Sequence, residues 1–176
     1  MSDLKVRKAE KGDFEKVMIF YRSMTDRMKE KGFTITWVKD VHPSPEFVKE
    51  SIEEGTLYMG ILEDRVVSAI TLNHRHAPEY GKIKWKEDLD DREVFVIHAL
   101  GVDPDMTGKG VGSGMVRAAA QTAAQKGGRA LRLDVLDTNR PARDLYLRNG
   151  FEYRGEAELY YENTGLRIFR MYELLL

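Results

Sequence analysis

The segment Leu100–Gly114 constrains this chain more than any other. It starts within Val94–Val102, a stretch that is apolar on both faces and therefore predicts a buried central strand. Alternate glycines follow, and an alanine-rich helix is predicted over Gly110–Gly127. Such glycines let the backbone approach a ligand closely, and the first N–H groups of a helix have no partner inside it. The pattern predicts an anion site, with a pyrophosphate as the expected occupant. The glycines are Gly108, Gly110, Gly112 and Gly114.

Two common phosphate-binding motifs do not fit this segment. A Walker A loop requires Gly-x-x-x-x-Gly-Lys-Ser/Thr, but its first glycine position is Asp103 and its Ser/Thr position is Gly110. The dinucleotide motif Gly-x-Gly-x-x-Gly meets Ser113 or Met115 where its last glycine should be. A P-loop nucleotide-binding function is therefore disfavoured.

A second motif follows one strand later, over Asn139–Phe151, with the sequence Asn-Arg-Pro-Ala-Arg-Asp-Leu-Tyr-Leu-Arg-Asn-Gly-Phe. It resembles the Asn…Ala…Tyr…Gly-Phe segment of the GNAT N-acetyltransferase family. Thr107–Gly112 resembles that family's Gln/Arg-x-x-Gly-x-Gly/Ala motif, although Thr107 stands where Gln or Arg is usual. Two motifs in this order, with a strand between them, are more specific than either alone. The chain is identified by this resemblance as a GNAT member.

The predicted elements agree with the fold that the resemblance implies. Hydrophobic periodicity and turn residues predict the order β-α-α-β-β-β-α-β-α-β-β. The expectation is a single domain over residues 1–176 with an α/β fold, in which about four helices flank a mixed sheet of about six to seven strands. A long loop is expected over His74–Arg92, and loops of that length are often functional.

The resemblance implies acetyl transfer from acetyl-CoA, as cosubstrate, to a primary amine. The backbone of Leu100, Gly101 and Val102 would bind the pantetheine arm, and Asn139 would bind near it. The glycine turn would hold the pyrophosphate, and Lys109 would add a charge at its rim. The residues implied for this turn are Thr107, Gly108, Lys109, Gly110, Val111, Gly112 and Ser113. A non-catalytic acyl-CoA sensor with the same fold is the alternative.

Tyr146 is the main catalytic candidate, because the resemblance points it at the sulfur and a phenol can protonate the departing thiolate. Without the motif, a core tyrosine would be the simpler interpretation. A base is also expected, and His98 and Glu93 on the central strand are the candidates. His98 has an ordinary pKa that suits a base at neutral pH, although a hydrogen-bonded core histidine is equally compatible with its position. Asn139 also fits a simple helix N-cap.

The acceptor amine is not encoded in any motif. The variable segments Phe33–Val41, His74–Arg92 and the hairpin around Tyr160 would decide it. The acidic run Glu87–Glu93 could attract a cationic amine, or it could be a solvated loop. His74 and His76 are weak evidence for a metal, so no metal site is predicted.

Composition excludes several other classes. Lys and Arg total 28 and Asp and Glu total 29, which gives no basic excess for nucleic acid. The absence of cysteine excludes disulfides and thiolate chemistry. No signal peptide is visible in Met1–Glu10 and no apolar run approaches roughly 18 residues, so a cytoplasmic protein without a membrane partner is expected. The final strand Leu166–Leu175 is long enough to help form a homodimer.

Overall fold

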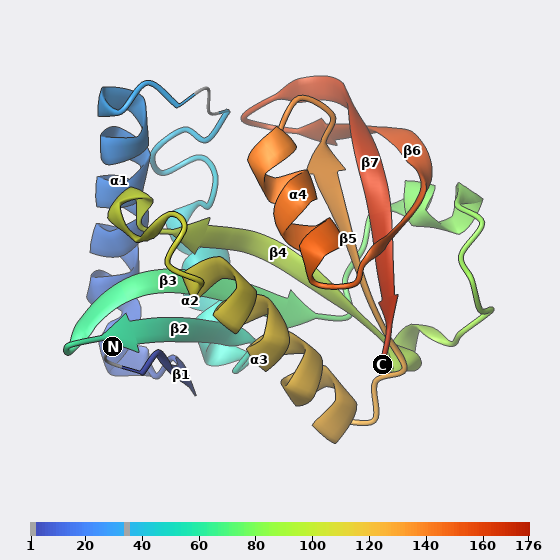
Figure 1. Ribbon diagram of the computed structural model, residues 1–176, viewed down its shortest axis with the longest axis horizontal. Coiled ribbons are helices and arrows are strands. Elements are labelled where there is room, and N and C mark those ends of the chain that lie inside the picture. Colours follow the sequence, from blue (N-terminus) through green and yellow to red (C-terminus); the bar gives the residue numbers. More distant parts are fainter. Residues whose placement is uncertain (1–2, 34–35) are drawn as a thin grey trace. The chain divides into compact units, whose positions relative to one another are not determined.

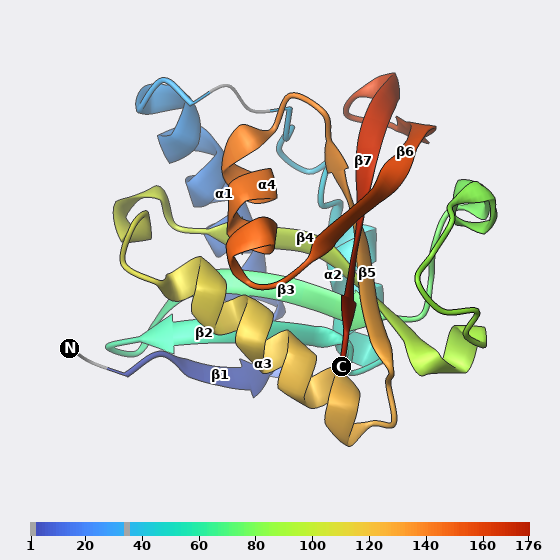
Figure 2. The same cartoon turned by 45° about the vertical axis from the view of Figure 1, so that its right-hand side comes forward.

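The computed structural model describes residues 3–33 and 36–176. Seven strands form one mixed sheet with the order β1-β2-β3-β4-β5-β7-β6, and Figures 1 and 2 show them from two sides. The pair β4 and β5 is parallel, whereas the β1–β2, β2–β3, β5–β7 and β6–β7 pairs are antiparallel. The strands are β1 (Lys5–Lys8), β2 (Leu57–Leu62), β3 (Arg65–Asn73), β4 (Val94–Val102), β5 (Ala130–Leu136), β6 (Glu152–Tyr161) and β7 (Gly165–Leu175).

Four α-helices accompany the sheet in the described part of the chain. They are α1 (Phe14–Glu30), α2 (Pro45–Glu53), α3 (Val111–Gln125) and α4 (Arg140–Arg148). Helix α2 begins as its sequence predicts, since the Ser44 hydroxyl oxygen accepts a bond from the Phe47 amide at 3.1 Å and Pro45 occupies the first turn. The predicted α/β fold and its order of elements are confirmed.

The β2–β3 hairpin turns at Glu63 and Asp64, where the sequence has no Asn-Gly pair. Both residues have positive φ, 48° and 60°. A two-residue turn of this hand matches the twist of the flanking strands, so the hairpin forms despite a moderate steric cost at two non-glycine positions. The spacing predicted the hairpin correctly, and the backbone conformation follows from the strand twist.

Contacts divide the chain into two compact units. The first comprises Met1–Thr71 with His98–Met115, and the second comprises Leu72–Ile97 with Val116–Leu176. In the first unit, apolar side chains of α1 and α2 pack on β2 and β3, with Val17, Val48 and Leu57 fully buried. The single-domain expectation stays a prediction.

The first unit also fixes the second half of β4. The hydroxyl of Tyr21, a buried residue of α1, donates to the Ala99 carbonyl at 2.7 Å. Ala99 has φ of 49°, an unusual conformation for a residue other than glycine and one that needs support from its surroundings. The hydrogen bond from Tyr21 provides part of that support.

Replacement of Tyr21 with phenylalanine should therefore destabilise the protein. The Ala99 carbonyl would lose its buried donor, and we expect the free energy of unfolding to fall by about 1–3 kcal/mol. Denaturant unfolding measures this loss. Tyr160→Phe is the control, because that side chain is 71% exposed and its loss of a hydroxyl should cost little. Equal stability of the two variants would contradict the supporting role of Tyr21.

The second unit is built on β5, β7 and β6, which run side by side in Figure 2. Its core includes Val96, Leu159 and Met171, all at most 2% exposed. Arg132 and Glu173 are cross-strand partners and form a buried ion pair of 2.8 Å. Arg132 also lies over the Trp85 ring, 4.3 Å from its centre, which ties the segment before β4 to the sheet.

The segment His74–Arg92 is less irregular than predicted. It contains the 3-10 helix η2 (Pro78–Lys82) and the start of η3 (Asp91–Glu93). Trp85 Nε1 donates to the Tyr80 carbonyl at 2.9 Å, and the Lys86 amide donates to Glu173 at 2.9 Å. Polar composition suggested a loop, but buried aromatic and ionic contacts order it.

Candidate active site

The glycine turn has the backbone that an anion cradle requires. Gly108 and Gly110 have φ of 77° and 80°, and α3 begins at the next residue, Val111. A Cβ added to either glycine would meet nothing within 4 Å, so these glycines serve backbone conformation rather than crowded packing. Thr107 through Gly110 are exposed. Ligands can therefore reach the turn and the first N–H groups of α3.

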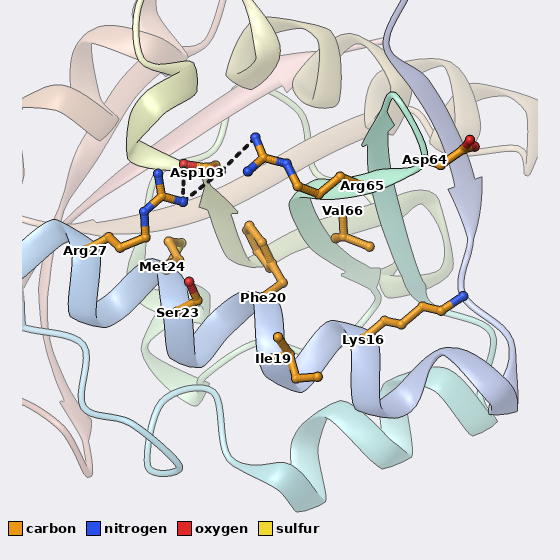
Figure 3. A pocket seen from close by; sticks show the side chains of 10 residues that line it. All are labelled: Lys16, Ile19, Phe20, Ser23, Met24, Arg27, Asp64, Arg65, Val66 and Asp103. Atoms are coloured by element: carbon orange, nitrogen blue, oxygen red, sulfur yellow. Dashed lines mark hydrogen bonds and ion pairs between the residues drawn. The ribbon is translucent and has the colours of Figure 1, made fainter.

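Asp103 fixes the approach to this turn. Its carboxylate is buried, accepts the Asp105 amide at 2.9 Å and binds Arg27 at 3.0 Å. Arg65, on the β2–β3 hairpin, lies 3.5 Å away. Figure 3 shows both guanidinium groups pointing toward Asp103. These bonds hold the end of β4 and the short 3-10 helix η4 (Pro104–Met106) that leads into the glycine turn.

A pocket of about 350 Å³ lies beside the Asp103 cluster, between α1 and the β2–β3 hairpin. Phe20, Met24 and Val66 give it an apolar lining, and Lys16 and Asp64 lie at the end away from Asp103 (Figure 3). Its charged groups are engaged mainly with one another, and no predicted site residue lines it.

The second half of β4 has one edge occupied by side chains of the first unit. The Gly101 carbonyl accepts the Ser68 hydroxyl at 2.7 Å, and the Ala99 carbonyl accepts Tyr21. Because backbone groups alternate in direction along a strand, Leu100 and Val102 direct theirs away from Ser68. That Leu100 and Val102 offer backbone groups to a ligand stays a prediction.

Asn139 and Tyr146 lie on one short helix, α4. The Asn139 side chain caps it by accepting the Ala142 amide at 3.3 Å. Tyr146 is 6% exposed, and its ring meets the Phe151 ring at 5.3 Å between centroids. Burial, helped by the negative charge of Asp134, raises the pKa of Tyr146 above its usual value. The phenol is therefore protonated at neutral pH, as a proton donor must be.

The two candidate bases differ in their surroundings. Glu93 accepts the Asp90 amide at 3.0 Å and lies 3.4 Å from Arg129. A helix cap and an ion pair therefore suffice to explain a glutamate just before β4. His98 is partly exposed and lies in the middle of β4, directly before Ala99. Both residues are partly exposed, and the identity of the base stays a prediction.

The paired histidines of the 74–92 segment have other partners. His74 Nδ1 lies 2.7 Å from the Val94 carbonyl oxygen, and His76 Nε2 lies 3.2 Å from Asp91. Across residues 3–33 and 36–176, no group of three or more His, Asp or Glu side chains is arranged to hold a metal ion. Within the same ranges, no helix combines the length and apolarity needed to cross a membrane.

Sequence reasoning missed Asp134. This acid lies in β5 between the apolar residues Leu133 and Val135, and its carboxylate accepts the Tyr80 hydroxyl at 2.7 Å. The Tyr161 hydroxyl lies 3.0 Å and 3.1 Å from its two oxygens. The sequence feature that could have identified it is an acidic residue inside a strand whose other residues are all buried. Its partners lie 54 and 27 residues away, which no local pattern shows.

Comparison with known proteins decides the family. The sequence pattern of the Acetyltransferase (GNAT) family matches residues 21–151, well over half of the chain. The chain belongs to the GNAT family. The predicted acyltransferase class is thereby confirmed at the level of the family.

Relatives of this GNAT chain include a putative [ribosomal protein bS18]-alanine N-acetyltransferase from Bacillus subtilis. It is 30% identical over 138 residues, which cover 78% of this chain and 79% of the relative. An uncharacterized N-acetyltransferase from Methanocaldococcus jannaschii is 38% identical over 39% of this chain and 30% of its own length. The thialysine N-epsilon-acetyltransferase of Bos taurus is 44% identical over 42% of this chain and 41% of its own length. The chain thus spans less than half the length of the Methanocaldococcus jannaschii and Bos taurus relatives.

Solved structures share the fold. An acetyltransferase of the GNAT family from Streptococcus agalactiae superposes with a TM-score of 0.77 at 17% identity, covering 98% of this chain and 95% of that one. One from Listeria monocytogenes gives 0.74 at 20% identity, covering 98% and 95%. At such identities the likeness concerns the fold, and it agrees with the mixed seven-stranded sheet.

Proposed function

We propose that this chain transfers an acetyl group from acetyl-CoA to a primary amine by direct attack on the thioester. The observation that carries the proposal is the turn with left-handed Gly108 and Gly110 at the start of α3, which follows the buried strand β4. Backbone N–H groups and the helix dipole favour a pyrophosphate there. Membership of the GNAT family makes the pyrophosphate of acetyl-CoA the natural occupant.

The remaining binding roles follow the family motif, residue by residue. Lys109 is exposed at the rim of the turn and adds a positive charge. Backbone groups of Leu100 and Val102 would bind the pantetheine arm in the manner of an added strand. Asn139 would bind the same arm while it caps α4. Thr107 lacks the longer side chain usual in the family, so the cradle depends on backbone groups.

The reaction needs one base and one acid. The attacking nitrogen forms a bond to the thioester carbon, and His98 is the favoured group to accept the proton that the amine releases. The carbon–sulfur bond then breaks and leaves a thiolate. Tyr146 donates its proton to that thiolate, a role that its place in the family motif implies; its raised pKa keeps the phenol protonated until the thiolate forms. The acceptors named for the relatives differ, so none of them is carried over by name.

Calorimetry with acetyl-CoA, followed by thiol-release assays over an amine panel, tests the proposal. Binding with turnover on one acceptor class is the expected result. Binding without turnover on a broad panel would favour the acyl-CoA sensor instead. Absence of binding would overturn the role of the glycine turn.

Gly110→Val tests that turn directly. Valine is strained at a φ of 80°, and its side chain would project into the open space before the turn. We expect the Kd for acetyl-CoA to rise by about thirtyfold or more, which corresponds to about 2 kcal/mol. Calorimetry measures this change.

Gly127→Val is the matched control for Gly110→Val. Gly127 has φ of 82° and equally open surroundings, but it follows the C-terminal end of α3. Both variants should lose similar stability, whereas only Gly110→Val should lose acetyl-CoA affinity. Equal effects on affinity would indicate general destabilisation and would contradict the cradle.

A further inference from the structure

Asp134 is a charged group that the proposed reaction does not use. Three segments of the second unit meet at its carboxylate: β5 itself, η2 through Tyr80, and the end of β6 through Tyr161. The residue is partly buried rather than sealed. A carboxylate has about four acceptor positions, and two hydroxyl donors do not fill them.

The charge of Asp134 has no cationic partner within the described ranges. Arg132 projects from the same face of β5, since the two residues are two positions apart. Its guanidinium is nevertheless committed to Glu173 and the Glu87 carbonyl, at 2.8 Å and 3.1 Å. Burial raises the pKa of Asp134, and only the two tyrosine hydrogen bonds oppose that shift. A partly buried carboxylate without a counter-ion is less stable than one in water, and a bound cation would offset this cost.

The two tyrosines whose hydroxyls contact this carboxylate also pack against other aromatic rings. The Tyr80 ring lies 5.6 Å from Trp85 and stacks at 5.2 Å on His76, measured between centroids. The Tyr161 ring meets Phe169 at 5.1 Å. The Trp85 face already holds the Arg132 guanidinium and the Tyr80 ring stacks on His76, so an ammonium group would contact the carboxylate and the tyrosine oxygens rather than a ring face.

One further negative charge supports the same interpretation. Glu79 precedes Tyr80, and its negative charge helps raise the pKa of Tyr161, so it adds to the negative potential there. The charge of Asp134 also raises the pKa of Tyr146, which places it within electrostatic reach of the proposed proton donor. If Asp134 only anchored the segment before β4, the neutral side chain of asparagine could accept the same two tyrosine hydrogen bonds, so the negative charge would have no structural role.

We propose that Asp134, with Tyr80 and Tyr161, forms a binding site for the ammonium group of an aliphatic amine, and that it selects cationic acceptors. That the bound amine is also the acetyl acceptor rests on the proposed function, whereas cation binding by this site does not. The site therefore favours alkylammonium compounds and diamines over uncharged molecules of the same length.

Calorimetric titration of the full chain, with and without saturating CoA, tests the site. The probes are 1,4-diaminobutane and its uncharged counterpart 1,4-butanediol. Asp134→Asn keeps an acceptor for both tyrosine hydroxyls and removes only the charge, so its melting temperature should stay near that of the wild type. Glu158→Gln is the control, because it removes an exposed acid from the same hairpin.

The expected result is binding of the diamine but not the diol by the wild type and by Glu158→Gln. Asp134→Asn should bind the diamine about tenfold more weakly or worse. If that variant does not fold, Glu79→Gln takes its place, with an expected weakening of about threefold. Unchanged diamine affinity in the folded test variant, or no diamine binding by the wild type in either condition, would overturn the proposal.

Acetyl-transfer assays on the same samples separate this proposal from the proposed function. Asp134-dependent diamine binding without turnover would leave the cation site standing and overturn the enzymatic role. Turnover by Asp134→Asn with an unchanged KM for the diamine would support the enzymatic role and overturn the cation site.

Discussion

Replacement of Tyr146 with phenylalanine is expected to lower kcat by about 10²–10⁴-fold with little change in the KM for acetyl-CoA. The reason is that the thiolate would lose its proton donor, and positioned acid catalysis contributes an effect of that size. The ring would still pack against Phe151, so the fold should be retained. Steady-state thiol-release assays measure the effect.

Tyr153→Phe is the control for this prediction, because Tyr153 is 48% exposed and has no role in the proposed reaction. The pH profile adds a second check. Since burial and the nearby Asp134 charge raise the pKa of Tyr146, the phenol stays protonated above its usual value near 10. Wild-type kcat should therefore show no falling limb from tyrosine ionisation below about pH 10. A wild-type kcat in Tyr146→Phe would refute the proton-donor role.

Replacement of Glu173 with alanine is expected to cost about 3–5 kcal/mol of unfolding free energy. The side chains of Glu173 and Arg132 are 1% and 9% exposed, so the change would leave a buried guanidinium without its partner. The Lys86 amide would also lose its acceptor. Denaturant unfolding gives the free energy directly.

Glu152→Ala is the matched control, since Glu152 is a β6 acid with a 55% exposed side chain that pairs with Lys86. Exposed ion pairs contribute at most about 1 kcal/mol, so this variant should be nearly as stable as the wild type. A double replacement, Arg132→Met with Glu173→Leu, should recover part of the loss, because the buried guanidinium of Arg132 is then removed together with its partner. A loss under 1 kcal/mol in Glu173→Ala would show that water reaches Arg132.

Local sequence was sufficient for the elements of secondary structure and their order. The Ser44-Pro45 pair placed the start of α2, and strand alternation placed β5 over Ala130–Leu136. The two motifs lie within short segments, so their resemblance to the GNAT family was visible in the sequence, and the comparisons confirmed the family. Thr34 and Ile35, in the predicted acceptor segment Phe33–Val41, lie outside the described residues.

Residues far apart in the sequence decided the rest. No residue pattern marks the left-handed Ala99, whereas the irregularity of β6 after Tyr153 coincides with a glycine inside the strand, Gly155. The cation site proposed at Asp134 exists only because the sheet brings η2 and β6 to the same face of β5. Periodicity reports which face of an element is buried, whereas the partners of a buried charge depend on how strands are ordered. The backbone conformation of Gly108 and Gly110 could therefore be predicted from the sequence, whereas the surroundings of Asp134 were fixed by tertiary structure alone.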